Sequence, residues 1–132
     1  MLKRFCLTAT LLLVAAVSMQ AAAQDPKPSI SGNQIETSWR DGLSASDQKA
    51  VERVAAGRSD QDRFMIYTAV VRSGEAARTY LPGERLDNMK VLANIRVRMS
   101  NDESNMWLAT WNRLSNRHRT ALLKVFRNQI KS

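Results

Sequence analysis

Hydrophobic residues recur every three or four positions along most of the chain, the spacing that places them on one face of an α-helix. The first run comprises Ile35, Trp39 and Leu43 and predicts a short helical segment. A second helix follows, for which either Ser44 or Ser46 is a suitable N-cap, because a serine hydroxyl accepts a hydrogen bond from a free backbone N–H. This helix is expected to run to about Ala56, where Gly57 stops it. Its inward face consists of Ala50, Val51, Val54 and Ala55.

A third helix is expected over residues 60–73, and we expect Gly74 to break it. Ser59 followed three residues later by Asp62 is a variant of the capping box, with Asp in place of the usual Glu. Residues 65–71 are also apolar enough for a buried strand, but the cap and the absence of flanking hairpin turns favour a helix. The inward positions of this helix are Phe64, Tyr67, Val70 and Val71.

The middle of the chain is interrupted once. Residues 75–81 predict a short helical or irregular link, and Pro82-Gly83 predicts a turn. From residue 84 to the end the chain contains neither glycine nor proline, which favours helix throughout. The next helix is expected over residues 84–99, although residues 95–99 alternate apolar and basic and are the best strand candidate. The inward face expected here is Leu86, Met89, Leu92, Ala93 and Val97.

Two further helices complete the chain. The segment Ser100-Asn101-Asp102 offers caps for one of them, and Ser115 offers a cap for the last. Their inward positions are Trp107, Trp111 and Leu114, then Ala121, Leu122, Val125, Phe126 and Ile130. The prediction is an all-α fold, a small single-domain bundle of about five or six helices with short links.

The N-terminal residues have the pattern of a secretory signal peptide. Lys3 and Arg4 precede an apolar run at 7–17, and the small residues Ala21–Ala23 provide a cleavage site before Gln24. We therefore expect bacterial Sec-type export to the periplasm or the medium, with no transmembrane segment after cleavage. The expected organisation is a cleaved signal peptide at 1–23, a flexible tether at 24–33 and a helical domain at 34–132.

The sequence contains one cysteine, Cys6, which lies within the predicted signal peptide. The remaining chain has no thiol, which excludes disulfides and thiolate chemistry from it. Its stability must then come from an apolar core, with homodimerisation as a further contribution that stays open.

Charge is distributed unevenly along the chain. The formal net charge is +8, and loss of Lys3 and Arg4 with the signal peptide would leave +6. Residues 24–83 carry eight basic and eight acidic residues, whereas residues 84–132 carry ten basic and four acidic ones. This asymmetry suggests an anionic partner for the C-terminal half. The alternative is an arginine-rich surface that serves only solubility.

A basic cluster in the last two helices is the main candidate site. On one continuous helix, Arg113, Arg117, Lys124 and Lys131 would share a face, and arginine binds a carboxylate or phosphate with two parallel hydrogen bonds. The expected partner is an acidic protein surface or an anionic envelope component such as a lipid headgroup. No nucleic-acid-binding motif is present, so nucleic acid is not the expected partner. The candidate binding residues are Arg113, Arg117, Arg119, Lys124 and Arg127.

Enzymatic chemistry is not favoured. His118, the only histidine, lies on an apolar row and lacks a second histidine, a cysteine or a following carboxylate for a metal site. It also lacks an evident nucleophile and orienting acid, since Ser115 is more simply a helix cap. Trp107 and Trp111 fit a buried face better than a stacking platform. We predict no catalytic residue, metal or cofactor, and a half-buried position for His118.

Two segments, residues 39–54 and 111–125, resemble each other. A duplication explains the match, but shared helix-start signals explain all of it except the tryptophans. The Leu-Ser pairs also resemble the Leu-Thr-x-x-Gln motifs of small helical periplasmic chaperones of the Spy type. This resemblance covers only Leu43-Ser44 and Leu114-Ser115, and Asp47 and His118 stand where the motif has Gln, so we transfer no function from it. The matched pairs are Trp39/Trp111, Leu43/Leu114, Ser44/Ser115, Ala50/Ala121, Val51/Leu122 and Val54/Val125.

Three functions stay open. The first is a non-enzymatic envelope protein that binds an acidic partner through the basic cluster. The second is a dimeric periplasmic chaperone or stress factor, which would expose part of its methionines because methionine makes adaptable binding surfaces. The third is an inhibitor or small enzyme of the envelope, with residues 75–83 as an inhibitory loop. The methionines in question are Met65, Met89, Met99 and Met106.

Overall fold

The computed structural model describes residues 32–131, and every regular element within them is an α-helix. The all-α fold expected from the sequence is confirmed. The predicted signal peptide and the predicted tether up to residue 31 lie outside the described residues, and the last two tether positions, Gly32 and Asn33, begin the first helix. The helices are α2 (Gly32–Ser38), α3 (Ala45–Ala55), α4 (Asp60–Ala77), α5 (Asn88–Val97), α6 (Asn101–Arg113) and α7 (Asn116–Lys131).

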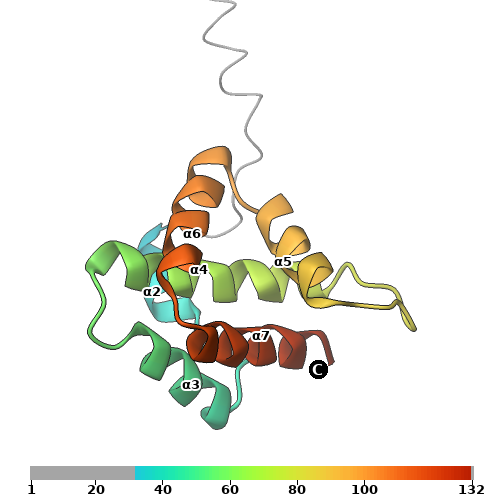
Figure 1. The fold of residues 1–132 in the computed structure, drawn as a ribbon. Helices are drawn as coiled ribbons and strands as arrows, with labels where there is room; N and C mark the ends of the chain where they lie inside the picture. The colour runs from blue at the N-terminus through green and yellow to red at the C-terminus, as the bar shows by residue number, and fades with distance from the viewer. Residues whose placement is uncertain (1–31, 132) are drawn as a thin grey trace, which may run out of the picture.

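Helix α4 lies at the centre and contacts each of the other described helices (Figure 1). In this view α5 and α6 lie above α4, whereas α3 and α7 lie side by side below it. The middle of α4 is fully buried, with Ile66, Ala69 and Val70 at 0% exposure. The core positions predicted for the last helix are confirmed, because Leu122, Val125 and Phe126 of α7 are buried in the hydrophobic core. Within residues 32–131, no helix is long and apolar enough to cross a membrane.

The helix starts follow the predicted caps. The hydroxyl oxygen of Ser44 accepts a hydrogen bond from the Asp47 N–H, so Ser44 rather than Ser46 caps α3. Ser59 and Ser100 accept the equivalent bonds at the starts of α4 and α6. Ser115 accepts from the backbone N–H of His118 before α7. Each bond satisfies one of the backbone N–H groups that a helix leaves unpaired at its N-terminus.

The two similar segments form two similar corners. At the α2–α3 corner, the side-chain amide of Gln48 donates to the carbonyl oxygens of Arg40 and Leu43. At the α6–α7 corner, the guanidinium of Arg119 donates to the carbonyl oxygens of Trp111 and Asn112. Both donors are the fourth residue after the capping serine. The resemblance therefore extends beyond the helix cap to a side chain that donates to carbonyl oxygens just before the new helix.

Helix α4 runs through Gly74 to Ala77, so the predicted break at Gly74 is wrong. A Cβ atom built on Gly74 would lie 3.3 Å from Nε2 of Gln129 on α7. The lack of a side chain at Gly74 lets α7 approach α4 closely, and the backbone of Gly74 stays helical. The predicted link at residues 75–81 is consequently helical up to Ala77 and irregular afterwards.

Helix α5 starts later than predicted. Residues 84–87 are not helical, and the Asp87 carboxylate caps the helix by accepting from the Lys90 N–H at 2.8 Å. The predicted turn at Pro82-Gly83 is present, with Gly83 in the left-handed region at φ 78°. Residues 95–97 end the helix, so the strand alternative is wrong.

The predicted inward face of α5 is wrong for Met89, Ala93 and Val97, which are exposed, whereas Leu86 and Leu92 are partly buried against the core as predicted. Val91 and Ile95 are buried at 1% exposure each, whereas Met89 is 81% and Val97 is 75% exposed. The prediction aligned the apolar period with Leu86, which lies before the helix. Contact with α4 selects the other apolar row.

A buried arginine joins α4 to α6. The Arg72 side chain has no solvent exposure, and its Nη1 donates to both carboxylate oxygens of Glu75 at 3.2 Å. Its Nε and Nη2 donate to Glu103 at 3.2 and 3.3 Å. Burial of a guanidinium requires such compensation by carboxylates. This cluster is a structural link between two helices.

Candidate functional site

The basic cluster predicted from the sequence does not lie on one continuous helix. Helix α6 ends at Arg113, and Leu114 is its C-cap in an extended conformation with ψ 144°. Ser115 then caps α7. The spacing argument that linked Arg113 to Arg117 therefore fails across this corner, and the five candidate residues have to be considered one at a time.

Arg113 is engaged with a buried carboxylate. Its Nε and Nη2 donate to the two oxygens of Asp62, at 3.1 and 2.5 Å, and the Thr110 hydroxyl donates to the same carboxylate at 2.8 Å. The hydrogen bond from Arg113 lowers the pKa of Asp62 below its usual 3.8, against the opposing effect of burial and with help from Thr110. Asp62 in turn raises the pKa of Arg113. The pair ties α4 to α6.

Arg119 and Arg127 also serve the fold. Arg119 closes the end of α6, as described above, and its guanidinium carbon lies 5.6 Å from the centre of the Trp111 ring. Arg127 donates to the side-chain oxygen of Asn88 and to the carbonyl oxygen of Leu86, at 2.6 and 3.0 Å, which fixes the start of α5 against α7. Three of the five candidates thus make intramolecular contacts.

Arg117 and Lys124 are different. Both are exposed on α7, and neither makes a hydrogen bond or ion pair with another described residue. They lie two turns apart on one side of the helix. Helix α7 contains no acidic residue that would offset their charge.

The neighbouring helix extends this positive surface. Helices α3 and α7 run antiparallel, because the Asn128 amide donates to the Asp47 carboxylate at 3.2 Å and Arg58 meets His118 at the opposite end. On α3, Lys49 and Arg53 are exposed and also lack a partner among residues 32–131. The acidic residues of α3 are engaged elsewhere, Asp47 with Asn128 and Glu52 with Arg40.

Helical geometry places both pairs of cations on the outer sides of two helices that are in contact. On α7, Leu122 and Phe126 face the core, whereas His118 and Asn128 face α3. Arg117 and Lys124 therefore lie on the outer side of α7, next to α3 and away from α4. The same reasoning places Lys49 and Arg53 on the outer side of α3. We call Lys49, Arg53, Arg117 and Lys124 the α3–α7 basic face.

His118 lies at one end of this face and is half-buried, as predicted. Its Nδ1 is 2.7 Å from Nη2 of Arg58, and a guanidinium can only donate, so Nδ1 acts as the acceptor and the ring is neutral. Burial lowers the pKa of His118 below its usual 6.5, and the charges of Arg58 and Arg117 lower it further. The Ser115 hydroxyl is occupied as a cap, so the two side chains do not form a catalytic pair.

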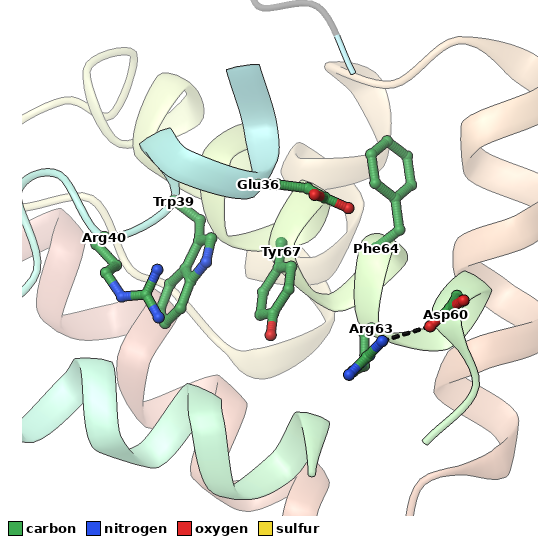
Figure 2. A pocket seen from close by; sticks show the side chains of 7 residues that line it. All are labelled: Glu36, Trp39, Arg40, Asp60, Arg63, Phe64 and Tyr67. Carbon is green, nitrogen blue, oxygen red and sulfur yellow. Dashed lines mark hydrogen bonds and ion pairs between the residues drawn. The ribbon is translucent and has the colours of Figure 1, made fainter. Parts of the chain in front are cut away.

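A cleft of about 440 Å³ lies between α2 and α4 (Figure 2). Trp39 and Tyr67 stack with ring centres 4.8 Å apart and planes 2° apart, and the Arg40 guanidinium lies 4.4 Å from the Trp39 ring on the other side. Trp39 lies in the core and Tyr67 packs against it, as predicted, but the apolar pattern of the sequence does not reveal the cleft that they border. The lining residues are Glu36, Trp39, Arg40, Asp60, Arg63, Phe64 and Tyr67.

The charged groups of this cleft largely satisfy each other. Arg63 pairs with Asp60, and Arg40 pairs with Glu52 at 3.2 Å. The Glu36 carboxylate points toward the gap between Tyr67 and Phe64 (Figure 2) and makes no hydrogen bond or ion pair with another described residue. The cleft contains no nucleophile paired with a base. No group of three or more His, Cys, Asp or Glu residues within the described part could hold a metal ion.

The methionine surface required by the chaperone hypothesis is not formed. Met65 and Met99 are buried at 0% and 5% exposure, so the prediction that they are partly exposed is wrong for both. Met106 is half-buried and packs on the core. Met89 alone among these four residues is highly exposed.

Comparison of the chain with protein-family models, with curated protein sequences and with solved structures finds no match. Its function therefore rests on the arrangement of its own side chains.

Proposed function

We propose that this is an exported, non-enzymatic helical binding protein whose α3–α7 basic face binds an acidic protein surface in the cell envelope. The observation that carries the proposal is the set of unpaired cations. Four exposed cations on two neighbouring helices have no anionic partner among the described residues, whereas Glu52 on α3 is paired with Arg40, and Asp47 is buried and bound by the amide of Asn128.

The spacing of the four cations supports binding of an anion larger than a single ion. Lys49 and Arg53 are one turn apart, about 6 Å along α3, and Arg117 and Lys124 are two turns apart, about 10 Å along α7. These separations are close to the Debye length of about 8 Å at physiological ionic strength, so the fields of the cations reinforce one another. A partner with several carboxylates or phosphates can contact them together.

Retention on immobilised poly-L-glutamate tests this proposal. The double variant R117E/K124E should elute at a clearly lower salt concentration than the wild type. The matched control is R85E/R98E, which makes the same change of net charge at two exposed arginines outside α3 and α7. The proposal predicts a much smaller shift for this control. Equal shifts for the two variants would show a response to net charge alone and would contradict a specific face.

Both variants change exposed side chains that make no hydrogen bond or ion pair with other described residues, so their helical circular dichroism and melting temperature should remain close to wild type. This measurement separates loss of binding from loss of structure.

A further inference from the structure

Helix α5 exposes apolar side chains to solvent. It buries Val91 and Ile95 against the rest of the bundle, whereas Met89 and Val97 are 81% and 75% exposed. Leu81, seven residues before the start of α5, is 72% exposed. These three are the large hydrophobic residues that stand exposed in the described part of the chain.

The exposed side chains of α5 form an ordered strip. Met89, Ala93 and Val97 follow one another at four-residue intervals, which places them on one side of the helix over about 12 Å. Arg96 lies on one edge of the strip and Lys90 on the other, by the same helical spacing. We call these five residues the α5 outer face.

Leu81 is tied to the same face. Its backbone N–H donates to Oε1 of Glu84 at 3.0 Å, and Oε2 of Glu84 pairs with Nζ of Lys90 at 2.5 Å. One carboxylate therefore bridges the turn that carries Leu81 and the edge of the strip. Leu81 is a third large exposed apolar side chain, on the turn that this carboxylate connects to Lys90.

The rim of this face is positive overall, because Arg85, Lys90, Arg96 and Arg98 outnumber the carboxylates of Glu84 and Asp87. Helix α5 contains no acidic residue. Arg96 donates from Nε to the Ser104 hydroxyl at 3.0 Å, and its charge is not matched by a carboxylate among the described residues. Arg85 before the helix and Arg98 at its C-cap are exposed and have no partner in residues 32–131. Lys90 is the one cation of the rim that is paired with an acid.

We propose that the α5 outer face docks the protein on the surface of an anionic phospholipid membrane. An apolar strip bordered by cations is the arrangement that lies in the headgroup region, with the apolar side chains at the acyl boundary and the cations at the phosphates. The face is a single convex helix and not a groove, which suits a planar surface. This proposal concerns a different helix from the α3–α7 basic face and goes beyond the function proposed above.

Docking of this kind is weak and reversible. Each arginine or lysine near an anionic surface contributes about a fivefold increase in affinity at moderate salt. Partial burial of three apolar side chains adds to this, and the loss of two of them should lower the affinity about tenfold. Binding should therefore require anionic lipid and should decrease as salt is raised.

Cosedimentation with vesicles tests the proposal. The purified protein should bind vesicles of phosphatidylglycerol and phosphatidylcholine, and should bind vesicles of phosphatidylcholine alone far less. M89Q/V97Q should weaken binding about tenfold without unfolding, because both side chains are exposed and glutamine is a good helix former. R85E/R98E should weaken it strongly, and R117E/K124E should bind like the wild type.

Three outcomes would overturn the proposal: no binding to anionic vesicles, wild-type binding by M89Q/V97Q, or loss of binding in R117E/K124E alone. If the protein does not bind anionic vesicles, an acidic protein would be the remaining partner for the α5 outer face. The two double charge reversals change net charge equally and should act oppositely in the vesicle and poly-L-glutamate assays. Failure of the vesicle assay alone therefore removes the membrane proposal and leaves the α3–α7 basic face standing.

Discussion

Arg113 at the end of α6 donates two hydrogen bonds to the carboxylate of Asp62 in the first turn of α4. Ser59 caps α4 through the backbone N–H of Asp62, while the Asp62 side chain turns away from the capping box and toward α6. A residue that local sequence assigns to a helix start thus forms a long-range link. The same contact removes Arg113 from the predicted binding cluster.

The first prediction concerns acid stability. Asp62→Asn should lower the free energy of unfolding at pH 6 by about 2 kcal/mol, because it removes charged hydrogen bonds from a buried site. The pKa of Asp62 is lower in the folded protein than its usual 3.8, so its stabilising effect is complete above that pH and is lost as the pH falls through the folded value. Urea titrations from pH 6 to pH 2 should show wild type and variant converging. A constant difference across this range would contradict the prediction.

The second prediction concerns His118. Its pKa is lowered in the folded state from 6.5, so the unfolded chain takes up the proton first and stability declines as the pH falls below 6.5. His118→Asn keeps an acceptor toward Arg58 and removes the titration. Thermal melting between pH 7.5 and pH 5 should show a smaller decline for the variant than for the wild type. Parallel declines would show that other groups control this pH range.

The third prediction concerns the close approach at Gly74. Gly74→Ala gains up to about 1 kcal/mol of helix propensity, but its Cβ meets Nε2 of Gln129, which donates to the Val70 carbonyl at 3.1 Å. We expect Gly74→Ala to stabilise the protein more in a Gln129→Ala background than in the wild type. A double-mutant cycle of unfolding free energies measures this coupling. Additive effects would mean that the Gln129 amide moves aside without cost.

The fourth prediction concerns the buried guanidinium. Arg72→Met should destabilise the protein by about 3 kcal/mol, because it leaves Glu75 and Glu103 facing each other without their shared cation. The triple variant R72M/E75Q/E103Q should regain most of that loss, since amides carry no charge. Chemical denaturation of the two variants provides the comparison. No recovery in the triple variant would indicate that packing around the guanidinium, rather than charge, sets its contribution.

Sequence alone predicts the local features of this fold. The caps at Ser44, Ser59, Ser100 and Ser115 depend on a hydrogen bond to a residue three positions later, so the necessary information lies within one turn. The buried rows of α3 and α7 are equally local, because each has a single apolar side. These elements need no knowledge of their neighbours.

Features set by contact between helices are less predictable. Helix α5 has apolar residues on both sides, Met89 and Val97 on one and Val91 and Ile95 on the other, so its period does not define the inward side. Packing against α4 decides between them. Gly74 shows the same limit, because a glycine that ends a helix and one that admits a neighbouring helix look alike in sequence.

The basic surface was half predictable. Arg117 and Lys124 belong to the excess of charge in the C-terminal half, whereas Lys49 and Arg53 lie in the half whose charges sum to zero. Their isolation appears only after Glu52 is found paired with Arg40. The resemblance between residues 39–54 and 111–125 is the one sequence feature that connects the two pairs of cations, since these segments contribute to α3 and α7, which pack together.

Titration of the protein with poly-L-glutamate at increasing sodium chloride, followed by tryptophan fluorescence, tests the central claim most directly. The α3–α7 basic face predicts that the logarithm of the dissociation constant rises with that of the salt concentration. It also predicts that the slope becomes close to zero in K49Q/R53Q/R117Q/K124Q. Salt-independent binding by the wild type, or an unchanged slope in the quadruple variant, would contradict it.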